Sequence, residues 1–260
     1  MDLRIKGKYA LVTGGTHGIG KSIALALAEE GCNVAVCSRD PKRIKDTLRE
    51  LKLKNVDALG IQADVTLKKD IKKVVDNVIC KWKTIHILIN NVGGGGRWGQ
   101  EDIEKTDENV WGEVFNKNVM SAVRFTTALI PYMRKQKWGR VVTITSVYGK
   151  EIGGRPWFNI AKVAQTVLMK NLALKKDLVR NGITFNSVAP GCIMIPDTGW
   201  DKEQRMNASG FKKYVKERFP LGRLGTPEEV ASIVTFLCSK QASLLNGASI
   251  SADGGEAGIL

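Results

Sequence analysis

Short apolar segments alternate with longer helical patterns from one end of the chain to the other. The apolar segments predict buried strands at 9–13, 33–37, 56–62, 85–89, 140–145, 183–188 and 248–251. Helical patterns fill 18–30, 107–134, 156–179 and 227–239, and a further helix opens at Asp40-Pro41, where proline suits the first turn. Continuous apolar strands joined by helices indicate a parallel sheet covered on both faces. We therefore expect an α/β fold with a doubly wound parallel sheet of about seven strands.

The pattern continues without interruption, which predicts one domain over residues 1–260. The length is sufficient for one large, well-buried core. No linker, internal repeat or low-complexity stretch separates two parts of the chain.

A glycine-rich turn joins the first predicted strand to its helix. Residues 13–20 read Thr-Gly-Gly-Thr-His-Gly-Ile-Gly. Gly14 allows the tight turn, Gly18 lets backbone approach a pyrophosphate, and Gly20 lets the helix pack on the sheet. The helix N-terminus attracts the anion. A strand before and a helix after are the context that this motif requires, so we predict a dinucleotide site that also involves Thr16, His17 and Ile19.

The end of the second predicted strand indicates which dinucleotide binds. NAD binders usually place a carboxylate there, whereas this chain has Ser38 and Arg39, and the first carboxylate after this strand is Asp40. Serine donates to a phosphate, and arginine forks or stacks on it. We predict NADP(H) rather than NAD(H), with His17 and Lys21 as weak further support. The alternative is that Arg39 is a solvated loop charge.

Motifs along the whole chain resemble the short-chain dehydrogenase/reductase family, in order and at its spacing. They are Thr13-Gly14 with Gly18 and Gly20, Asn90-Asn91-Val92-Gly93, Asn118, Ser146, Lys162, Pro190-Gly191, the segment 223–231 and Asp253-Gly254-Gly255. The resemblance implies a Rossmann-type fold and an oxidoreductase that interconverts a carbonyl and a secondary alcohol by hydride transfer. It also implies a homotetramer or homodimer, and it says almost nothing about the substrate.

The resemblance implies further cofactor contacts after the later strands. They are Asp64 and Val65 beside the adenine, Asn90, Asn91 and Gly93 beside the ribose and nicotinamide, Lys162 on the nicotinamide ribose, and Pro190, Gly191 and Ile193 against the nicotinamide ring. Where the family usually has a threonine that touches the cofactor, this chain has Ile195, which leaves Thr198 as the replacement.

The catalytic residues that the resemblance implies are present except for one. Ser146 would hydrogen-bond the carbonyl oxygen, Lys162 would lower the pKa of a tyrosine, and Asn118 would hold a water in a relay. The tyrosine position, four residues before Lys162 and on the same helix face, is occupied by Phe158. A phenyl ring fills the space and transfers no proton, so the general acid–base contribution is in question.

Three interpretations of Phe158 compete. In the first, another group supplies the proton: Tyr148, Lys162 or a bound water. In the second, the protein binds cofactor and ligand and turns over poorly, by nature or through a substitution. In the third the alignment is displaced, but no other tyrosine precedes a lysine by four residues in this segment. Two further functions remain as alternatives: a non-catalytic or regulatory dinucleotide-binding protein, and a 3-oxoacyl-carrier-protein reductase whose basic surface docks an acidic carrier.

Aromatic and basic residues gather in the segments expected around the substrate. They are Arg97, Trp98, Arg155, Trp157 and Trp200. Tryptophan faces suit sugars and rings, and arginine suits carboxylate or phosphate. We expect a small carbonyl or alcohol substrate that is polar, anionic or sugar-like. The alternative is that these aromatic residues serve packing and subunit contacts.

Composition excludes several other classes. The net charge is +14, but the lysines are spread along helical segments such as 68–73 and 212–216, so we expect no nucleic-acid partner. No apolar run reaches the ~18 residues that cross a bilayer, and the first residues do not begin a secretory signal, so we expect a cytoplasmic protein without a membrane partner. The five cysteines have no Cys-x-x-Cys pair, and with only His17 and His86 we expect no metal site.

Overall fold

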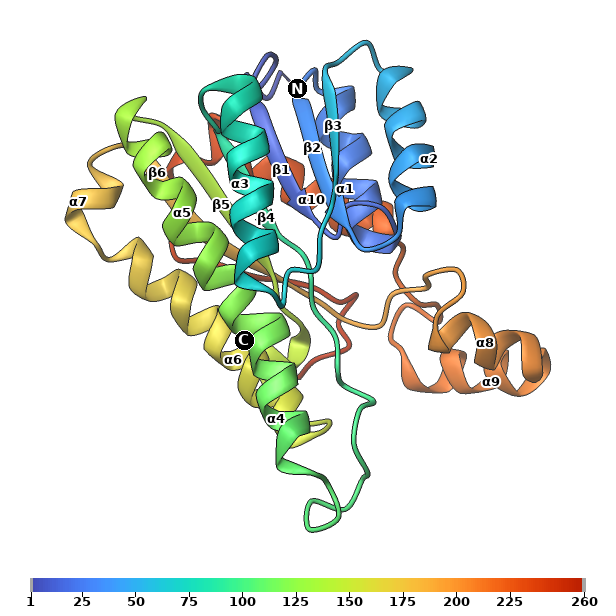
Figure 1. The fold of residues 1–260 in the computed structure, drawn as a ribbon. Coiled ribbons are helices and arrows are strands. Elements are labelled where there is room, and N and C mark those ends of the chain that lie inside the picture. The colour runs from blue at the N-terminus through green and yellow to red at the C-terminus, as the bar shows by residue number, and fades with distance from the viewer. Residues whose placement is uncertain (1, 259–260) are drawn as a thin grey trace.

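The computed structural model describes residues 2–258 and shows a seven-stranded parallel sheet with the strand order β3-β2-β1-β4-β5-β6-β7 (Figure 1). The strands are β1 (Tyr9–Thr13), β2 (Asn33–Ser38), β3 (Ala58–Gln62), β4 (Ile87–Asn90), β5 (Gly139–Ile144), β6 (Ile183–Pro190) and β7 (Ser249–Ala252). The order reverses between β1 and β4, where ligands bind in doubly wound sheets. The predicted fold class is confirmed.

Helices cover both faces of the sheet (Figure 1). One face packs against α1 (Gly18–Glu29), α2 (Pro41–Lys52) and α10 (Pro227–Leu237), and the other against α3 (Lys68–Trp82), α5 (Ser121–Lys135) and α6 (Pro156–Ala173). The remaining helical segments are α4 (Glu108–Phe115), η1 (Asn116–Met120), η2 (Val147–Gly149), α7 (Lys176–Val179), α8 (Gly199–Met206), α9 (Ala208–Arg218) and η3 (Gln241–Leu244). Because both sheet faces are buried, the central strands are mostly apolar, and the polar residues within them, such as Asn90, Thr143 and Asn186, are buried as well.

Two long predicted helices are irregular in the structure. The pattern at 107–134 forms α4 and α5, joined without a break by η1, a turn of π-helix centred on Asn118. Such wide turns often occur at functional sites. The pattern at 156–179 ends at Ala173, and the short α7 begins at Lys176. The 107–134 prediction therefore agrees with the continuous helical run from Glu108 to Lys135. The predicted end of the second helix was wrong, because the periodicity continues across the break before α7.

The turn after β1 has the conformation that its glycines predict. Gly14 and Gly18 have φ angles of 64° and 51°, a region that other residues rarely adopt. Asn91, after β4, donates from Nδ2 to the carbonyl oxygens of Thr13 and Gly14 at 2.9 and 3.3 Å. This cross-strand tie holds the first turn at the carboxyl edge of the sheet.

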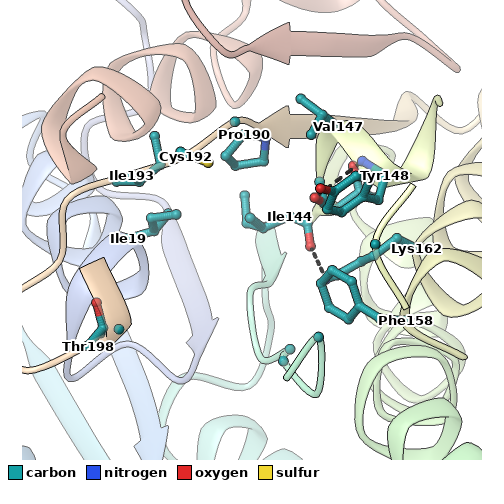
Figure 2. A pocket seen from close by; sticks show the side chains of 18 of the residues that line it. Ile19, Ile144, Val147, Tyr148, Phe158, Lys162, Pro190, Cys192, Ile193 and Thr198 are labelled. Atoms are coloured by element: carbon teal, nitrogen blue, oxygen red, sulfur yellow. Dashed lines mark hydrogen bonds between the residues drawn. The ribbon is translucent and has the colours of Figure 1, made fainter. Parts of the chain in front are cut away.

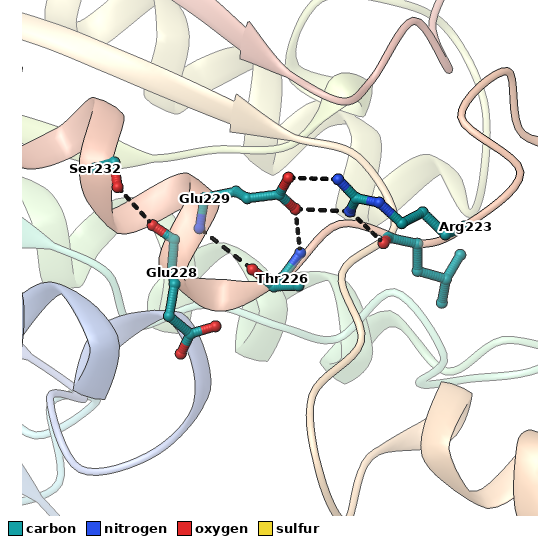
Figure 3. A network of polar contacts seen from close by, with 6 residues as sticks. Arg223, Thr226, Glu228, Glu229 and Ser232 are labelled. Atoms are coloured by element: carbon teal, nitrogen blue, oxygen red, sulfur yellow. Dashed lines mark hydrogen bonds and ion pairs between the residues drawn. The ribbon is translucent and has the colours of Figure 1, made fainter.

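The N-terminus of α10 is held by reciprocal hydrogen bonds (Figure 3). Thr226 Oγ1 accepts from the backbone N–H of Glu229, and Glu229 Oε2 accepts from the backbone N–H of Thr226 at 2.8 Å. Arg223 forks onto the same carboxylate at 2.6 and 2.9 Å. This capping box directs α10 along α1, where both helices bury apolar residues.

His86 has a structural environment. Its Nδ1 accepts from the backbone N–H of Tyr9 at 3.2 Å, and its ring contacts Trp138. Burial and the nearby Lys8 charge lower the pKa of His86 to about 4, so the ring is neutral near pH 7. Within residues 2–258, no cluster of three or more His, Cys, Asp or Glu side chains could hold a metal ion. None of the helices described is long and apolar enough to cross a membrane.

Candidate active site

Two adjoining cavities open at the carboxyl edge of the sheet. The larger has a volume of about 1040 Å³ and the smaller about 520 Å³. Both are lined by His17, Asn91 and Gly93, so they form one continuous cleft beside the glycine-rich turn. The position is the topological switch point between β1 and β4.

Predicted cofactor residues from several strand ends line these cavities. Gly14, Thr16, Ser38, Arg39, Asp64 and Val65 line the smaller cavity, and Gly18, Ile19, Gly20, Lys162, Pro190, Gly191 and Ile193 line the larger one. The sheet therefore brings together residues that are up to 179 positions apart in the chain, from Gly14 to Ile193 (193 − 14).

The smaller cavity is strongly basic at the end of β2. Arg39 lines it together with Arg43 and Lys117, two cations that the sequence analysis did not select. Asp40, the nearest carboxylate in sequence, is instead the N-cap of α2 and accepts from the backbone N–H groups of Lys42 and Arg43. Arg43 lies in the first turn of α2, three residues after Asp40.

Asp64 lines the same cavity, close to Arg39 and Lys117. Its partial burial alone would raise its pKa, but hydrogen bonds from Thr66 and the charges of Arg39 and Lys117 lower the pKa of Asp64 below its usual value. Lys117 Nζ also lies 4.5 Å from the centre of the Trp98 ring. Trp98 was expected near the substrate, but it lines the smaller cavity, whereas Ser146 lines the larger one.

The expectation that Asn90 lies beside the cofactor is wrong. Its side chain donates to the hydroxyl of Thr126 at 3.1 Å and is buried between α5 and β5, so it does not line either cavity. The neighbouring Asn91 does line both. Successive side chains at a strand end point to opposite sides, and the register of β4 decides which asparagine faces the cleft.

Asn118 and Lys162 meet behind Gly93. Asn118 is fully buried, and its Nδ2 donates to the carbonyl oxygens of Gly94 and Val114, both at 2.8 Å. A Cβ atom at residue 93 would lie 2.8 Å from Lys162 Nζ and 2.9 Å from Asn118 Oδ1. Only glycine leaves room for both side chains to approach the backbone at this point.

Lys162 is a buried amine that reaches the larger cavity. Its Nζ donates to the carbonyl oxygen of Ile144 at 3.2 Å and to Gln165 Oε1 at 3.0 Å. Burial, followed by the charge of Lys117, lowers the pKa of Lys162 to about 7. The side chain can therefore exist in either protonation state near neutral pH.

Tyr148 and Phe158 form one wall of the larger cavity (Figure 2), and Ser146 also lines this cavity. Ser146 precedes η2, and its Oγ accepts from the backbone N–H of Tyr148 at 3.3 Å. The rings of Tyr148 and Phe158 meet edge to face with centroids 6.5 Å apart. Lys162 Nζ lies 5.5 Å from the centre of the Phe158 ring. Burial raises the pKa of Tyr148, so its phenol is protonated at neutral pH.

The segment after β6 closes the opposite wall. Ile195 packs against Gly18, where a Cβ would lie 3.0 Å from it. Thr198 lines the cavity as expected, but its hydroxyl donates to the carbonyl oxygen of Ile195 at 2.7 Å. Beyond it, α8 and α9 project from the body of the molecule (Figure 1), and Trp200 packs among aromatic residues of α9 and its C-terminal end.

The two arginines expected near the substrate line the larger cavity, and both are already engaged. Arg97 pairs with Glu203 at 2.9 Å and lies over the Trp200 ring. Arg155 donates to the carbonyl oxygens of Trp98 and Gly99.

The expectation that Trp157 contacts substrate is wrong. Trp157 is 2% exposed and packs edge-on against Trp111, so it is a core residue of the α4–α6 contact. Trp157 Nε1 donates to the carbonyl oxygen of Gly95 at 3.3 Å.

Glu256 is a cavity residue that the sequence analysis missed. Gly254 and Gly255, both with positive φ, turn the chain after β7 so that the Glu256 carboxylate enters the larger cavity. Its two oxygens accept from the backbone N–H and the thiol of Cys192 at 2.6 and 3.1 Å. No short-range pattern predicts this contact, because its partners are 64 residues apart.

Comparisons with known proteins agree with this geometry. The profile of a family described as enoyl-(acyl carrier protein) reductase matches residues 14–256. The chain is 34% identical over 257 residues to a 3-oxoacyl-[acyl-carrier-protein] reductase, FabG, of Aquifex aeolicus, covering 98% of this chain and 99% of that protein. It is 32% identical over 254 residues to mouse dehydrogenase/reductase SDR family member 4, covering 96% and 88%.

A solved structure of similar fold is L-sorbose reductase from Gluconobacter frateurii in complex with NADPH and L-sorbose. It has a TM-score of 0.91 and 31% identity, and each chain is covered completely. A 7α-hydroxysteroid dehydrogenase in complex with NADH has a TM-score of 0.87 and 28% identity, over 98% of this chain and 96% of that chain. The family profile, the full-length relatives and the cleft together show that this chain belongs to the short-chain dehydrogenase/reductase family of oxidoreductases.

Proposed function

We propose that this protein is an NADP(H)-dependent oxidoreductase that interconverts a carbonyl and a secondary alcohol. The observation that carries the proposal is the single cleft that joins the glycine-rich turn to Ser146 and Lys162. Ser146 would hydrogen-bond the substrate oxygen, and Lys162 would hold the nicotinamide ribose. The bound dinucleotide supplies or accepts the hydride.

The cofactor preference rests on charge around the end of β2. Ser38, Arg39, Arg43 and Lys117 line the smaller cavity, and the carboxylate of Asp40 is turned away into a helix cap. This arrangement suits a ribose 2′-phosphate, which a carboxylate would repel. The NADPH complex of L-sorbose reductase supports the same choice.

The proton would come from a group other than residue 158. Phe158 occupies the tyrosine position of the family pattern, and its ring lies between Gly96 and Lys162. Tyr148 and Lys162 are the nearest titratable groups on this wall of the cavity, and both can carry a proton at neutral pH. We propose Tyr148 as the acid, with Lys162 or water as the alternative.

The substrate would be an uncharged, hydroxyl-rich ketone or alcohol, such as a keto-sugar. Arg97 and Arg155 line the cavity but are already paired, whereas the Glu256 carboxylate faces the same space without a cation among its hydrogen-bond partners. A carboxylate accepts from sugar hydroxyls and repels anions. The L-sorbose complex of a structural relative agrees with this class.

A second function has specific support. Several relatives are named 3-oxoacyl-[acyl-carrier-protein] reductase, and the net charge of +14 suits an acidic carrier. Docking to a carrier would weaken steeply with salt, whereas binding of a neutral sugar would not. Turnover of a carrier-linked ketone between 20 and 300 mM salt separates the two.

We also propose a homo-oligomer built on α6. Apolar residues on one side of this helix are partly or largely exposed: Ile160, Val163 and Val167, at 52%, 39% and 50%. Their spacing places them on one stripe, which a second copy would cover. Sedimentation of the parent and of Val167→Glu tests this assembly, since a charge on that stripe would dissociate it.

The test of the main proposal is NADPH oxidation over a panel of keto-sugars, keto-acids and carrier-linked ketones, with NADPH affinity measured by fluorescence. Turnover that is best with keto-sugars supports the proposal. Tight NADPH binding without turnover on any ketone would instead support a non-catalytic dinucleotide-binding protein. Failure to bind NADPH or NADH would overturn both.

A further inference from the structure

Gln165 is a fully buried amide that joins two groups of the candidate active site. It lies on α6, three residues after Lys162, and is 0% exposed. Its Oε1 accepts from Lys162 Nζ at 3.0 Å, and its Nε2 donates to the backbone carbonyl oxygen of Asn118 at 2.8 Å. One side chain therefore connects α6 to the π-turn η1.

The Asn118 carbonyl lies in the π-turn η1, where it also accepts from Ser121 Oγ at 3.4 Å. In a regular helix each backbone carbonyl accepts from the N–H four residues later, and a wide turn releases carbonyls from that pattern. The resemblance to the family implies a water between Asn118 and Lys162. Here the side-chain amide of Gln165 makes that connection directly.

We propose that Gln165 is a positioning residue that holds Lys162 Nζ between α6 and β5 and takes the place of a connecting water. Lys162 has three N–H donors when it is protonated. Gln165 Oε1 and the Ile144 carbonyl accept two of them, and Figure 2 shows the bond to Ile144 beside Phe158. The third then points toward the cavity that Lys162 lines.

A lysine held in this way does not depend on a tyrosine for its position. The Phe158 ring offers Lys162 its face and no hydrogen bond. The Gln165 carbonyl oxygen stabilises the charged amine, which opposes the effect of burial and of the nearby Lys117 charge. From the other elements around the cavity, the titratable or charged groups are His17, Arg97, Glu101, Tyr148, Arg155, Cys192 and Glu256.

We expect two substitutions of Gln165 to shift the pKa of Lys162 in opposite directions. Gln165→Met removes the acceptor and lowers the pKa of Lys162, whereas Gln165→Glu adds a negative charge and raises it, each by about one unit. Both variants lose the bond to the Asn118 carbonyl. If the role of Gln165 were merely structural, both substitutions would therefore change the stability of the protein in the same direction. Thr166→Val, which removes a hydroxyl bonded to the Lys162 backbone carbonyl, is the matched control.

The experiment measures thermal unfolding of the four proteins without cofactor from pH 6 to pH 10. We expect the Tm of Gln165→Glu to fall relative to that of Gln165→Met as the pH rises, because neutral Lys162 leaves the introduced carboxylate buried and unpaired. The Thr166→Val protein should follow the parent at every pH. A constant Tm difference between the two Gln165 variants would overturn the proposal.

A second measurement connects the lysine to the cofactor, and here the inference rests on the proposed function. Protonated Lys162 attracts the dinucleotide, so NADPH affinity should fall as the pH rises through the pKa of Lys162. The midpoint should move to lower pH in Gln165→Met and to higher pH in Gln165→Glu. Absence of NADPH binding by the parent would refute the proposed function, while the unfolding experiment would still decide the role of Gln165.

Discussion

Lys162 Nζ lies 5.5 Å from the centre of the Phe158 ring, where the family pattern would place a phenol beside the amine. The two residues are one helical turn apart on α6, so their side chains meet on the same face. The ring beside the amine carries no hydroxyl, and for this reason we propose that the proton comes from another group.

Phe158→Tyr is expected to raise kcat for carbonyl reduction by about 10²–10⁴-fold, the usual contribution of a general acid. The introduced hydroxyl would lie beside Lys162, which lowers its pKa and holds it toward the cavity. Steady-state NADPH oxidation of parent and variant checks this. Phe158→Leu is the control for changed packing, and an equal gain with leucine would contradict the explanation.

Tyr148→Phe is expected to lower the residual kcat of the parent by at least about tenfold, because it removes the proposed proton donor while its ring stays in place. In the Phe158→Tyr background the same change should have little effect. Tyr132→Phe, on α5 and outside both cavities, is the matched control. An unchanged rate in Tyr148→Phe would assign the proton to Lys162 or to water.

Arg39→Ala is expected to raise the Kd for NADPH by about 10–100-fold and to leave the Kd for NADH nearly unchanged. The reason is the loss of a charge-assisted hydrogen bond to the 2′-phosphate, typically about 1.5–3 kcal/mol. Titration of NADPH and NADH by fluorescence gives both values. Arg180→Ala, an exposed residue after α7, should change neither. Equal losses of affinity for the two dinucleotides would show that Arg39 does not bind the 2′-phosphate.

Stability should fall between pH 6.5 and pH 4 because of His86. Its folded pKa of about 4 is below the unfolded value of about 6.5, so the unfolded chain takes up a proton first as the pH falls. The loss from this residue is about 2–3 kcal/mol. The His86→Gln protein keeps an acceptor for the Tyr9 N–H. Over the same pH range it should lose about 2–3 kcal/mol less stability than the parent. Denaturant unfolding at pH 7 and pH 4.5 tests this, and parallel losses would contradict it.

Thr226→Ala is expected to destabilise the protein by about 1 kcal/mol, because it removes the side-chain half of the α10 capping box (Figure 3). Ser232→Ala is the control, since its exposed hydroxyl bonds the Glu228 carbonyl oxygen within the same helix. Chemical denaturation of the three proteins measures the difference. Equal stabilities for parent and Thr226→Ala would show that the Arg223–Glu229 pair alone holds this helix end.

The cofactor side of the site was the more predictable part. Ser38 ends a strand, Gly14 and Asp64 come just after one, and parallel strands place all their carboxyl ends at one edge of the sheet. A correct strand assignment therefore brings these residues together without any knowledge of side-chain packing. The Phe158–Lys162 relationship was equally visible, because four residues are one turn of a helix.

The amino-acid sequence by itself determined the parallel sheet, the glycine-rich turn and the Phe158–Lys162 contact, because these depend on periodicity and on short, regular spacing. Only the tertiary structure decided that Trp157 belongs to the core, that Asn91 rather than Asn90 faces the cleft, and that Gln165 and Glu256 reach the site. Gln165 contacts a carbonyl 47 residues away, and Glu256 an N–H 64 residues away. Such contacts depend on how whole helices and turns pack, and local spacing carries no information about that.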